Sequence, residues 1–285
     1  MQAQFYTNQN TLFNTATSPF TKVYGVGRSL LALSTLLTLV FNNYAILFSP
    51  TYHHDLNGIN FFLLFGYNYL WLSKKIAILI LFAVISGVYP RMTGILHWWI
   101  SFSAFHAFLV VDGGDQVISV LTFFLVFITM FDERKNHWSN VVSQSTVSIY
   151  IGNLVMLLIR IQVIVLYLMA AVRKLYIPEW VNGTAEYYWL TNTFFGAPHY
   201  LMWLVHLLIL NHAVIFMLTW GTILFELLLC VGIFFKPKAR IQLLKAGIIF
   251  HFLIFIFMGF GSFFFAMTGS LVLYLYPPAD KTNRL

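Results

Sequence analysis

Charge and cysteine are both scarce in this chain of 285 residues. Only 9% of the residues are charged, whereas 60% are hydrophobic and 19% are aromatic; an ordinary soluble domain has about 25% charged residues. A soluble protein of this size needs more charged residues on its surface than this chain has. The chain is therefore an integral membrane protein. The single cysteine, Cys230, excludes disulfide frameworks and sites built from several cysteines. The formal charge of +7 is typical of basic residues that flank membrane spans, and we expect no nucleic-acid partner.

The apolar runs predict an all-α, polytopic membrane bundle with about six to eight transmembrane helices. Spans are expected near residues 24–48, 75–90, 92–110, 115–131 and 143–172, followed by a span that ends at Phe235 and a last run to Tyr276. That last run is too long for one crossing and should break at Gly259, Gly261 or Gly269. Interfacial or re-entrant segments are expected at 49–73 and 199–208. We predict one membrane domain over 1–285, with a core at 20–276, a polar start at 1–19 and a tail at 277–285.

Short loops rich in Lys and Arg favour the cytoplasmic side of a membrane. Most of the basic residues lie in four places, which we assign to the inside together with the N-terminus: Lys22, Arg91, the 132–138 loop and a connector at 236–245. This path places residues 173–198 outside, where polar and aromatic residues gather.

Four ionisable residues fall inside predicted spans, where each needs a partner or a function: Arg28, Arg160, Glu226 and His251. Arg160, Tyr167 and Lys174 recur every seven residues, so they form one helical stripe with about 10 Å between successive members. Two interpretations of the stripe are open: the wall of a functional interior, or an Arg160–Glu226 pair that joins two helices, with Lys174 extending to the interface. Arg28 is expected to extend to the interface at the inner end.

The histidines do not predict a metal site, because none has the i, i+4 spacing of a helical metal pair. His251 lies within the apolar run IIFHFLIFIFMGF, where a histidine is ordinarily a packing residue. Asp112 and Asp115 flank two glycines, and a solvated turn and a ligand contact are both open for them. A carboxylate inside a span needs a partner, and the two spans around the connector predict His251 or Arg160 for Glu226.

The stretch IVLYLMAAVRKLYIPEWVNGTAEYYWL resembles a region of the vitamin K-dependent γ-glutamyl carboxylase superfamily. There, a helix ends in Ala/Gly-x-x-Lys-Leu and is followed by Asp/Glu-Trp-x-x-Gly-x-x-x-x-Tyr. The matched positions are Ala171, Lys174, Leu175, Glu179, Trp180, Gly183 and Tyr188, with Tyr187 adjacent. The resemblance continues through the MFDERKNHWS loop upstream and, downstream, through Pro198, Glu226 and His251.

This resemblance implies a reduced quinone as cofactor, Lys174 as the base that deprotonates it, and His251 beside the quinone. Lys174 must be neutral for that role, which burial and the cations Arg173 and Arg160 would favour. We therefore expect Lys174 to turn inward under Trp180, Tyr187 and Tyr188. The candidate residues are Lys174, His251 and Glu226 for catalysis and Arg160, Tyr167, Trp180, Tyr187, Tyr188 and Asp115 for substrate binding. Asp115 and Gln116 stand near the place of a carboxylase histidine, which argues against glutamate carboxylation itself.

The stretch SPFTKVYGVGRSLLALSTLLTLVFN resembles the sporulation-delaying protein B family, in the horizontally transferred transmembrane (HTTM) group. The matched positions are Phe20, Thr21, Val23, Tyr24, Gly25, Arg28 and Ser29 through Leu33. The resemblance implies a multi-pass protein of the bacterial cytoplasmic membrane that matures a secreted peptide toxin or bacteriocin. Its partners would be the lipid bilayer, the precursor peptide and a sporulation-delaying protein A-like protein. A non-catalytic factor for peptide export, binding or immunity is the alternative, and a solute transporter is disfavoured because no repeat is visible.

Overall fold

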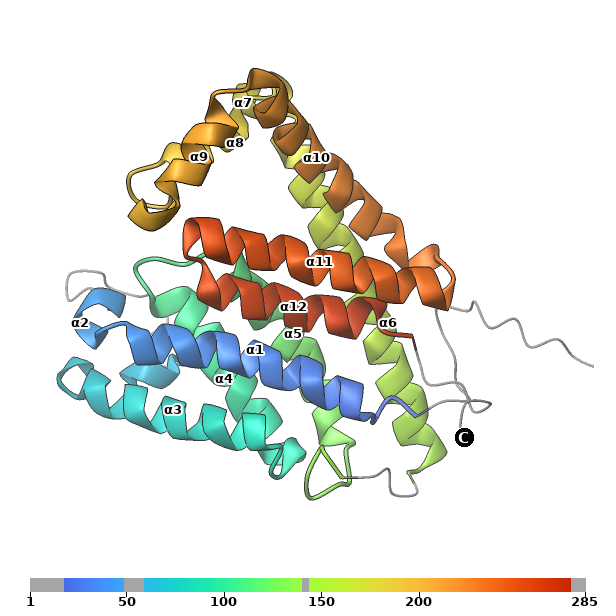
Figure 1. The fold of residues 1–285 in the computed structure, drawn as a ribbon. Helices are drawn as coiled ribbons and strands as arrows, with labels where there is room; N and C mark the ends of the chain where they lie inside the picture. Colours follow the sequence, from blue (N-terminus) through green and yellow to red (C-terminus); the bar gives the residue numbers. More distant parts are fainter. Residues whose placement is uncertain (1–17, 49–58, 140–143, 278–285) are drawn as a thin grey trace, which may run out of the picture.

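The computed structural model describes residues 18–48, 59–139 and 144–277, and within them every regular element is a helix (Figure 1). The long helices are α1 (Lys22–Phe41), α3 (Leu70–Ser86), α4 (Pro90–Ala107), α5 (Gly113–Met130), α6 (Thr146–Lys174), α10 (His212–Val231), α11 (Pro237–Met258) and α12 (Gly261–Leu275). The short ones are α2 (Tyr44–Leu47), α7 (Pro178–Val181), α8 (Ala185–Thr191), α9 (Met202–Ile209) and the 3₁₀ turns η1 (Phe61–Leu63), η2 (Tyr67–Tyr69), η3 (His199–Leu201) and η4 (Gly232–Phe234). Six of these helices are long and apolar enough to cross a membrane: α1, α3 with η2, α5, α6, α10 with η4, and α11. The prediction of a polytopic membrane bundle is thus confirmed.

Local sequence signals set the ends of these helices. Gly87, at φ 84°, ends α3 in a left-handed turn, and Pro90 opens α4 three residues later. Asp112 and Asp115 form a capping box at the start of α5, in which each carboxylate accepts a backbone N–H of the other residue. The last apolar run breaks at Gly259, at φ 74°, which is one of the three glycines predicted for the break.

Two predicted boundaries are wrong. Helix α11 begins at Pro237, so most of the expected connector at 236–245 is helical. Helix α3 begins at Leu70, so Lys74 and Lys75 belong to its first turns rather than to a preceding segment. Of the interfacial segment expected at 49–73, residues 49–58 lie outside the described residues, and the remainder forms η1, η2 and the start of α3.

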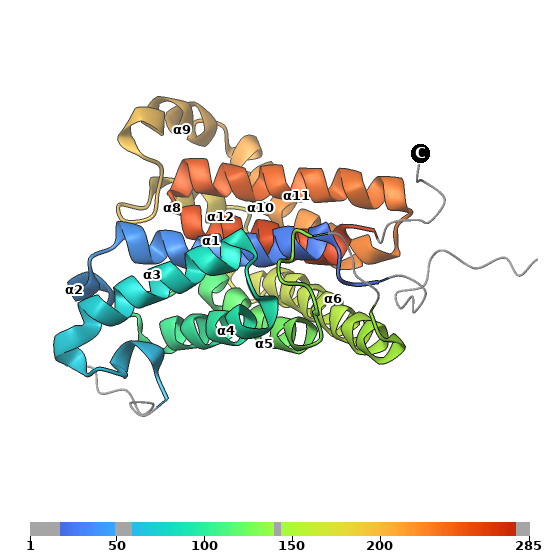
Figure 2. The same ribbon diagram turned by 90° about the horizontal axis from the view of Figure 1, so that it is seen from below.

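The long helices form two layers (Figures 1 and 2). One layer has the order α11, α12, α1 and α3, and the other has the order α4, α5, α6 and α10, with α12 packed on α5 and α6. Leu31, Leu121, Ile159 and Leu271 belong to the largest apolar cluster, which lies where α1, α5, α6 and α12 meet. Helices α6 and α10 pair with each other and lean away from α11, and α7, α8 and α9 cross the open side of that angle (Figure 1).

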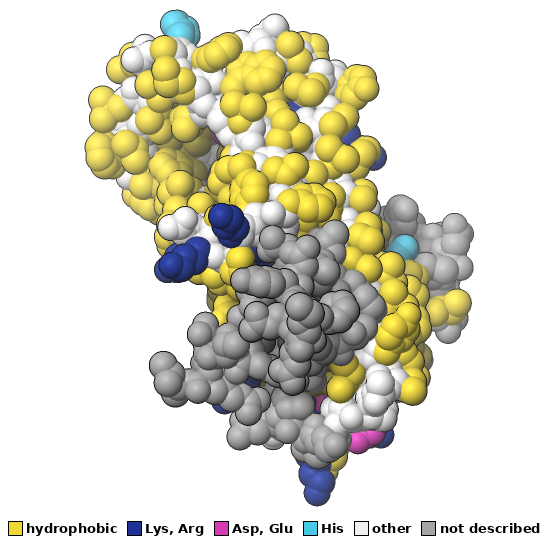
Figure 3. All heavy atoms as spheres, turned by 90° about the vertical axis from the view of Figure 1, so that its right-hand side faces the viewer, with side chains coloured by type: hydrophobic (Ala, Val, Ile, Leu, Met, Phe, Trp, Pro, Cys, Tyr) yellow, Lys and Arg dark blue, Asp and Glu magenta, His cyan; other side chains and the backbone are white. Residues whose placement is uncertain are grey.

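The segments assigned to one side of the membrane gather at one end of the bundle. The start of α1 lies beside the 132–139 loop, because a carbon atom placed at Cβ of Gly25 would lie 3.0 Å from the His137 ring. The start of α11 lies beside the end of α12, where Arg240 donates to the Tyr274 carbonyl. Figure 3 views this end, where Lys and Arg side chains gather in a few places amid a mostly hydrophobic surface. That this end faces the cytoplasm stays a prediction.

A buried polar network corrects the prediction for Arg28. Its side chain is fully buried instead of extending to the interface. The Arg28 guanidinium donates to Thr93 Oγ1 at 2.7 Å and lies 3.0 Å from Nδ1 of His137. Behind it, Arg134 makes a two-pronged ion pair with Asp132, at 2.8 Å for each contact. Helix α1 is thereby fixed to α4 and to the 132–139 loop.

Candidate functional site

The centre of the candidate site is an ion pair between α6 and α10. The Lys174 ammonium lies 2.7 Å from both carboxylate oxygens of Glu226. The two side chains are 18% and 11% exposed, so Lys174 turns inward, as predicted. The prediction that Glu226 has a cationic or imidazole partner is met by Lys174, but the named partners, His251 and Arg160, are wrong.

The end of α6 fixes the direction of the Lys174 side chain. Pro178 has no backbone N–H to donate, so α6 cannot continue through it. It opens the single turn of α7 just beyond α6 instead. That turn brings the ring of Trp180 over the ammonium, with Nζ 5.0 Å from the ring centroid. Trp180 packs with Ala171 and Ile223 in a small apolar cluster. The site therefore has a hydrophobic wall on one side and a carboxylate on the other.

A second buried contact lies deeper in the bundle and joins α6 to α11. Tyr167 Oη lies 3.0 Å from Nε2 of His251, and both side chains are buried. The rings of Phe250 and Phe263 stand against the imidazole, with centroids 5.1 and 5.5 Å away. Nδ1 of His251 is buried and has no hydrogen-bond partner among the described residues. The charge of Glu226 acts on Tyr167 and that of Lys174 acts on His251, so both pairs belong to one cluster.

Glu186 is a member of this cluster that the sequence prediction missed. It lies on α8 and accepts a hydrogen bond from the Thr222 hydroxyl at 3.1 Å. The charges of both Lys174 and Glu226 act on its carboxyl group. Burial raises the pKa of Glu186 above its ordinary value. The only signal in the sequence was an acidic residue in an otherwise uncharged stretch, TAEYYWLTNTFF. The site thus combines one amine with two carboxyl groups.

Four of the predicted binding positions lie apart from this cluster. Asp115 holds the start of α5 through the capping box. Tyr187 and Tyr188 pack edge to face on each other and are 43% and 57% exposed, so they do not enclose Lys174 as expected. Arg160 lies on α6 about 21 Å from Lys174 (14 residues at about 1.5 Å), which excludes the predicted pairing with Glu226.

Three features of the site attract positive charge at Lys174. They are the carboxylate of Glu226, the face of the Trp180 ring and the C-terminal end of the α6 dipole. Proton transfer from Lys174 to Glu226 would give a neutral amine beside a neutral carboxyl, with no change in net charge. Among the described residues, no group of three or more His, Cys, Asp or Glu is placed to hold a metal ion.

Comparison with known proteins gives close relatives of similar length. No family model and no solved structure matches the chain. It is 35% identical over 274 residues to the uncharacterized protein YitO of Bacillus subtilis (strain 168), which covers 93% of this chain and 88% of YitO. It is also 35% identical over 273 residues to the sporulation-delaying protein SdpB of the same organism, which covers 91% of this chain and 83% of SdpB. The chain therefore belongs to the family of SdpB and YitO.

Proposed function

We propose that this protein is a membrane component in the maturation of a secreted precursor peptide, with the Lys174–Glu226 pair as its reactive site. The observation behind the proposal is the pair itself, an amine bound to a carboxylate, with Glu186 beside it and Tyr167 and His251 behind it. Membership of the SdpB family supports the biological context. The sequence resemblance to the carboxylase superfamily, with Lys174 at the position of a base, supports the role of the amine.

Lys174 would act as a base after its proton moves to Glu226. The two groups are at hydrogen-bond distance, 2.7 Å, so the proton moves without a change in geometry. The neutral amine then accepts a proton from a bound group and becomes an ammonium again, and Glu226 gives up its proton to the solution when the product leaves. Glu186 is the group through which protons would exchange with the solution, because its carboxyl has a raised pKa and lies at the same cluster.

The residues around His251 fit the quinone that the carboxylase resemblance implies. The unpartnered Nδ1 of His251 would accept a hydrogen bond from a quinol hydroxyl, and Phe263 and Phe250 would hold the ring. When bound, such a cofactor would supply reducing equivalents. The protein's own part would be to orient the ring and to remove a proton.

A non-catalytic role is the second candidate. The same ion pair joins α6 to α10, and a pair with both groups mostly buried could serve only to hold the two helices. In that case the protein would bind or export the peptide without changing it. Two substitutions at Lys174 distinguish these roles, because arginine keeps the charge but does not release a proton.

The experiment measures the mature peptide by mass spectrometry in cells that express Lys174→Arg, Lys174→Ala or Arg173→Ala at equal levels. If Lys174 is a base, both Lys174 variants lose maturation, whereas Arg173→Ala, a change at the exposed neighbouring residue, retains it. If Lys174→Arg matures the peptide as the wild type does, the ion pair is structural and the catalytic proposal is wrong.

A further inference from the structure

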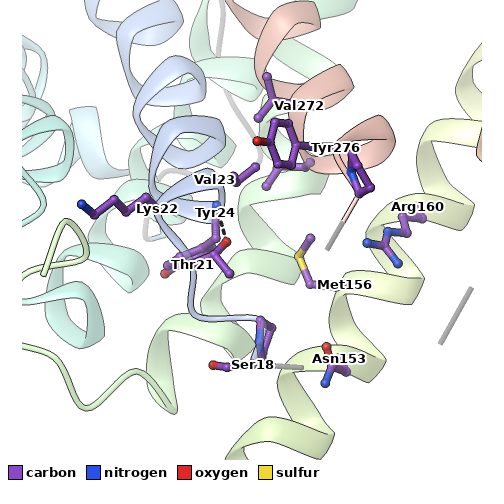
Figure 4. Close-up of a pocket in the computed structure, with 13 residues that line it drawn as sticks. Ser18, Thr21, Lys22, Val23, Tyr24, Asn153, Met156, Arg160, Val272 and Tyr276 are labelled. Carbon is purple, nitrogen blue, oxygen red and sulfur yellow. Dashed lines mark hydrogen bonds between the residues drawn. The ribbon is translucent and has the colours of Figure 1, made fainter. Parts of the chain in front are cut away.

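A pocket of about 270 Å³ opens at the basic end of the bundle, between the start of α1, the middle of α6 and the end of α12 (Figure 4). Its wall includes Thr21 from the cap of α1, Asn153, Met156 and Arg160 from α6, and Val272 and Tyr276 from α12. Since Arg160 is about 21 Å from Lys174 along α6, the pocket is separate from the proposed reactive site.

The polar part of the pocket is suited to an anion. None of the described residues that line it is acidic, and the Arg160 side chain extends from α6 toward Tyr276 and Met156 (Figure 4). A second guanidinium, that of Arg240, is close enough to act electrostatically on Arg160. Arg240 also donates to the carbonyl of Tyr276, a residue of the wall. Two like charges held near one cavity are stabilised by a bound anion.

The rest of the pocket is apolar. Met156, Val23, Val272 and Leu273 present hydrocarbon to the cavity. The chain before α1 closes it against α6, because a Cβ added at Gly152 would meet Pro19 at 2.5 Å. A glycine at this place thus permits the close approach that shapes the cavity. The lining suits a ligand with a charged head and a hydrocarbon part.

We propose that this pocket binds a phosphate group through Arg160, either the phosphate of an anionic lipid headgroup or free phosphate. The guanidinium of arginine matches the geometry of a phosphate and binds it through two N–H groups. Basic pockets between transmembrane helices are sites where lipid headgroups bind. A lipid in this pocket would lie against α1, α6 and α12 together and would hold the two layers of the bundle to each other.

The test uses the full-length protein, purified in detergent and mixed with phosphatidylglycerol or with inorganic phosphate. Lipid adducts are counted by native mass spectrometry, and thermal unfolding is followed with each ligand. The variants are Arg160→Gln, which removes the guanidinium, Met156→Trp, which fills the cavity and keeps both arginines, and Arg173→Gln. The last is the matched control, because it removes the same charge from the far end of the same helix.

We expect phosphatidylglycerol to bind the wild type and Arg173→Gln equally, and to bind Arg160→Gln and Met156→Trp about tenfold more weakly. Stabilisation by inorganic phosphate that Arg160→Gln abolishes would instead identify free phosphate as the ligand. If neither ligand binds, or if Arg173→Gln weakens binding as much as Arg160→Gln, the proposal is wrong. Should Arg160→Gln fail to fold, Met156→Trp decides alone, because its retention of full binding would overturn the proposal.

Discussion

Two basic residues of this bundle that are shielded from solvent, Arg28 and Lys174, are held by different kinds of partner. Arg28 is completely buried among neutral groups, the His137 imidazole and the Thr93 hydroxyl. Lys174 is bound to a carboxylate and keeps 18% of its side chain exposed. A guanidinium among neutral acceptors cannot pass on its proton, whereas an ammonium on a carboxylate can. Arg28 is thus a fixed joint at one end of the molecule, whereas the contact of Lys174 at the other end allows the proton transfer that the proposed function requires.

The largest effect is expected when the Lys174 pair is broken from one side. Glu226→Gln leaves the ammonium without its counter-charge and should lower the free energy of unfolding by about 2–4 kcal/mol, slightly less than for a completely buried pair. The double variant Lys174→Met/Glu226→Gln should recover most of that loss, because it removes the stranded charge. Denaturant unfolding in micelles measures both, and a double variant as unstable as the single one would contradict the explanation.

A smaller loss is expected at the other joint. Arg28→Met removes the hydrogen bonds to His137 and Thr93 but strands no charge, so we expect a loss of about 1–3 kcal/mol. Thr93 keeps its hydrogen bonds to the carbonyls of Val88 and Tyr89, which limits the effect. Unfolding in the same micelles measures the loss. If Arg28→Met is less stable than Glu226→Gln, neutral partners stabilise a buried cation at least as much as a carboxylate does, which would contradict the comparison.

The pH dependence of stability should identify His137. Burial, with the neighbouring Arg28 and Arg134 charges, lowers the pKa of His137 to about 3. The unfolded chain then binds the extra proton between about pH 6.5 and about pH 3, so the folded state loses stability as the pH falls through that window. The slope is at most about 1.4 kcal/mol per pH unit. His137→Asn keeps an acceptor for Arg28 but cannot titrate, so the pH slope of its free energy of unfolding should be smaller by up to that amount. A slope equal to that of the wild type would assign the pH dependence to other groups.

The smallest effect is expected next to the site. Arg173→Gln changes an exposed residue adjacent to Lys174, and the free energy of unfolding should stay within about 0.5 kcal/mol of the wild type. A larger effect of substitution at the neighbouring Lys174 would then come from the burial of Lys174 and from its ion pair with Glu226. A large loss on Arg173→Gln, measured in the same micelles, would mean that charge at this end of α6 matters wherever it is placed.

The sequence was sufficient for most of the long helices and for the inward direction of Lys174. Apolar runs define the spans, and Gly259 and Pro178 mark where two of them end, because backbone freedom and a missing N–H act locally. The start of α11 differs from the prediction because a basic stretch favours a loop between spans, whereas Pro237 is well placed at the first turn of a helix.

The partners of the buried polar groups could not be predicted in the same way. With Pro237 at its start, α11 rises about 21 Å before His251 (14 residues at about 1.5 Å), which is too deep to meet Glu226 near the end of α10. His137 is 109 residues from Arg28, and Glu186 reaches the cluster only through the short helix α8. Such contacts depend on the tilt of the helices and on the path of the loops. The periodicity of apolar residues in the sequence predicts neither.

The packing of α1 against α12 has a consequence for biogenesis. Ser34 on α1 donates to the carbonyl of Ser262, 228 residues later, and the backbones approach closely where a Cβ on Gly269 would lie 3.1 Å from the Gly27 carbonyl. Helix α1 therefore enters the bilayer long before the ribosome has made the helix that covers it. Arg28, in the second turn of α1, also enters before His137 exists. Its cost is below the value of about 2.5–3.5 kcal/mol for an arginine at the centre of a span, and the leucines of α1 must offset it. Insertion intermediates of this chain thus hold an uncovered first helix until translation reaches α12.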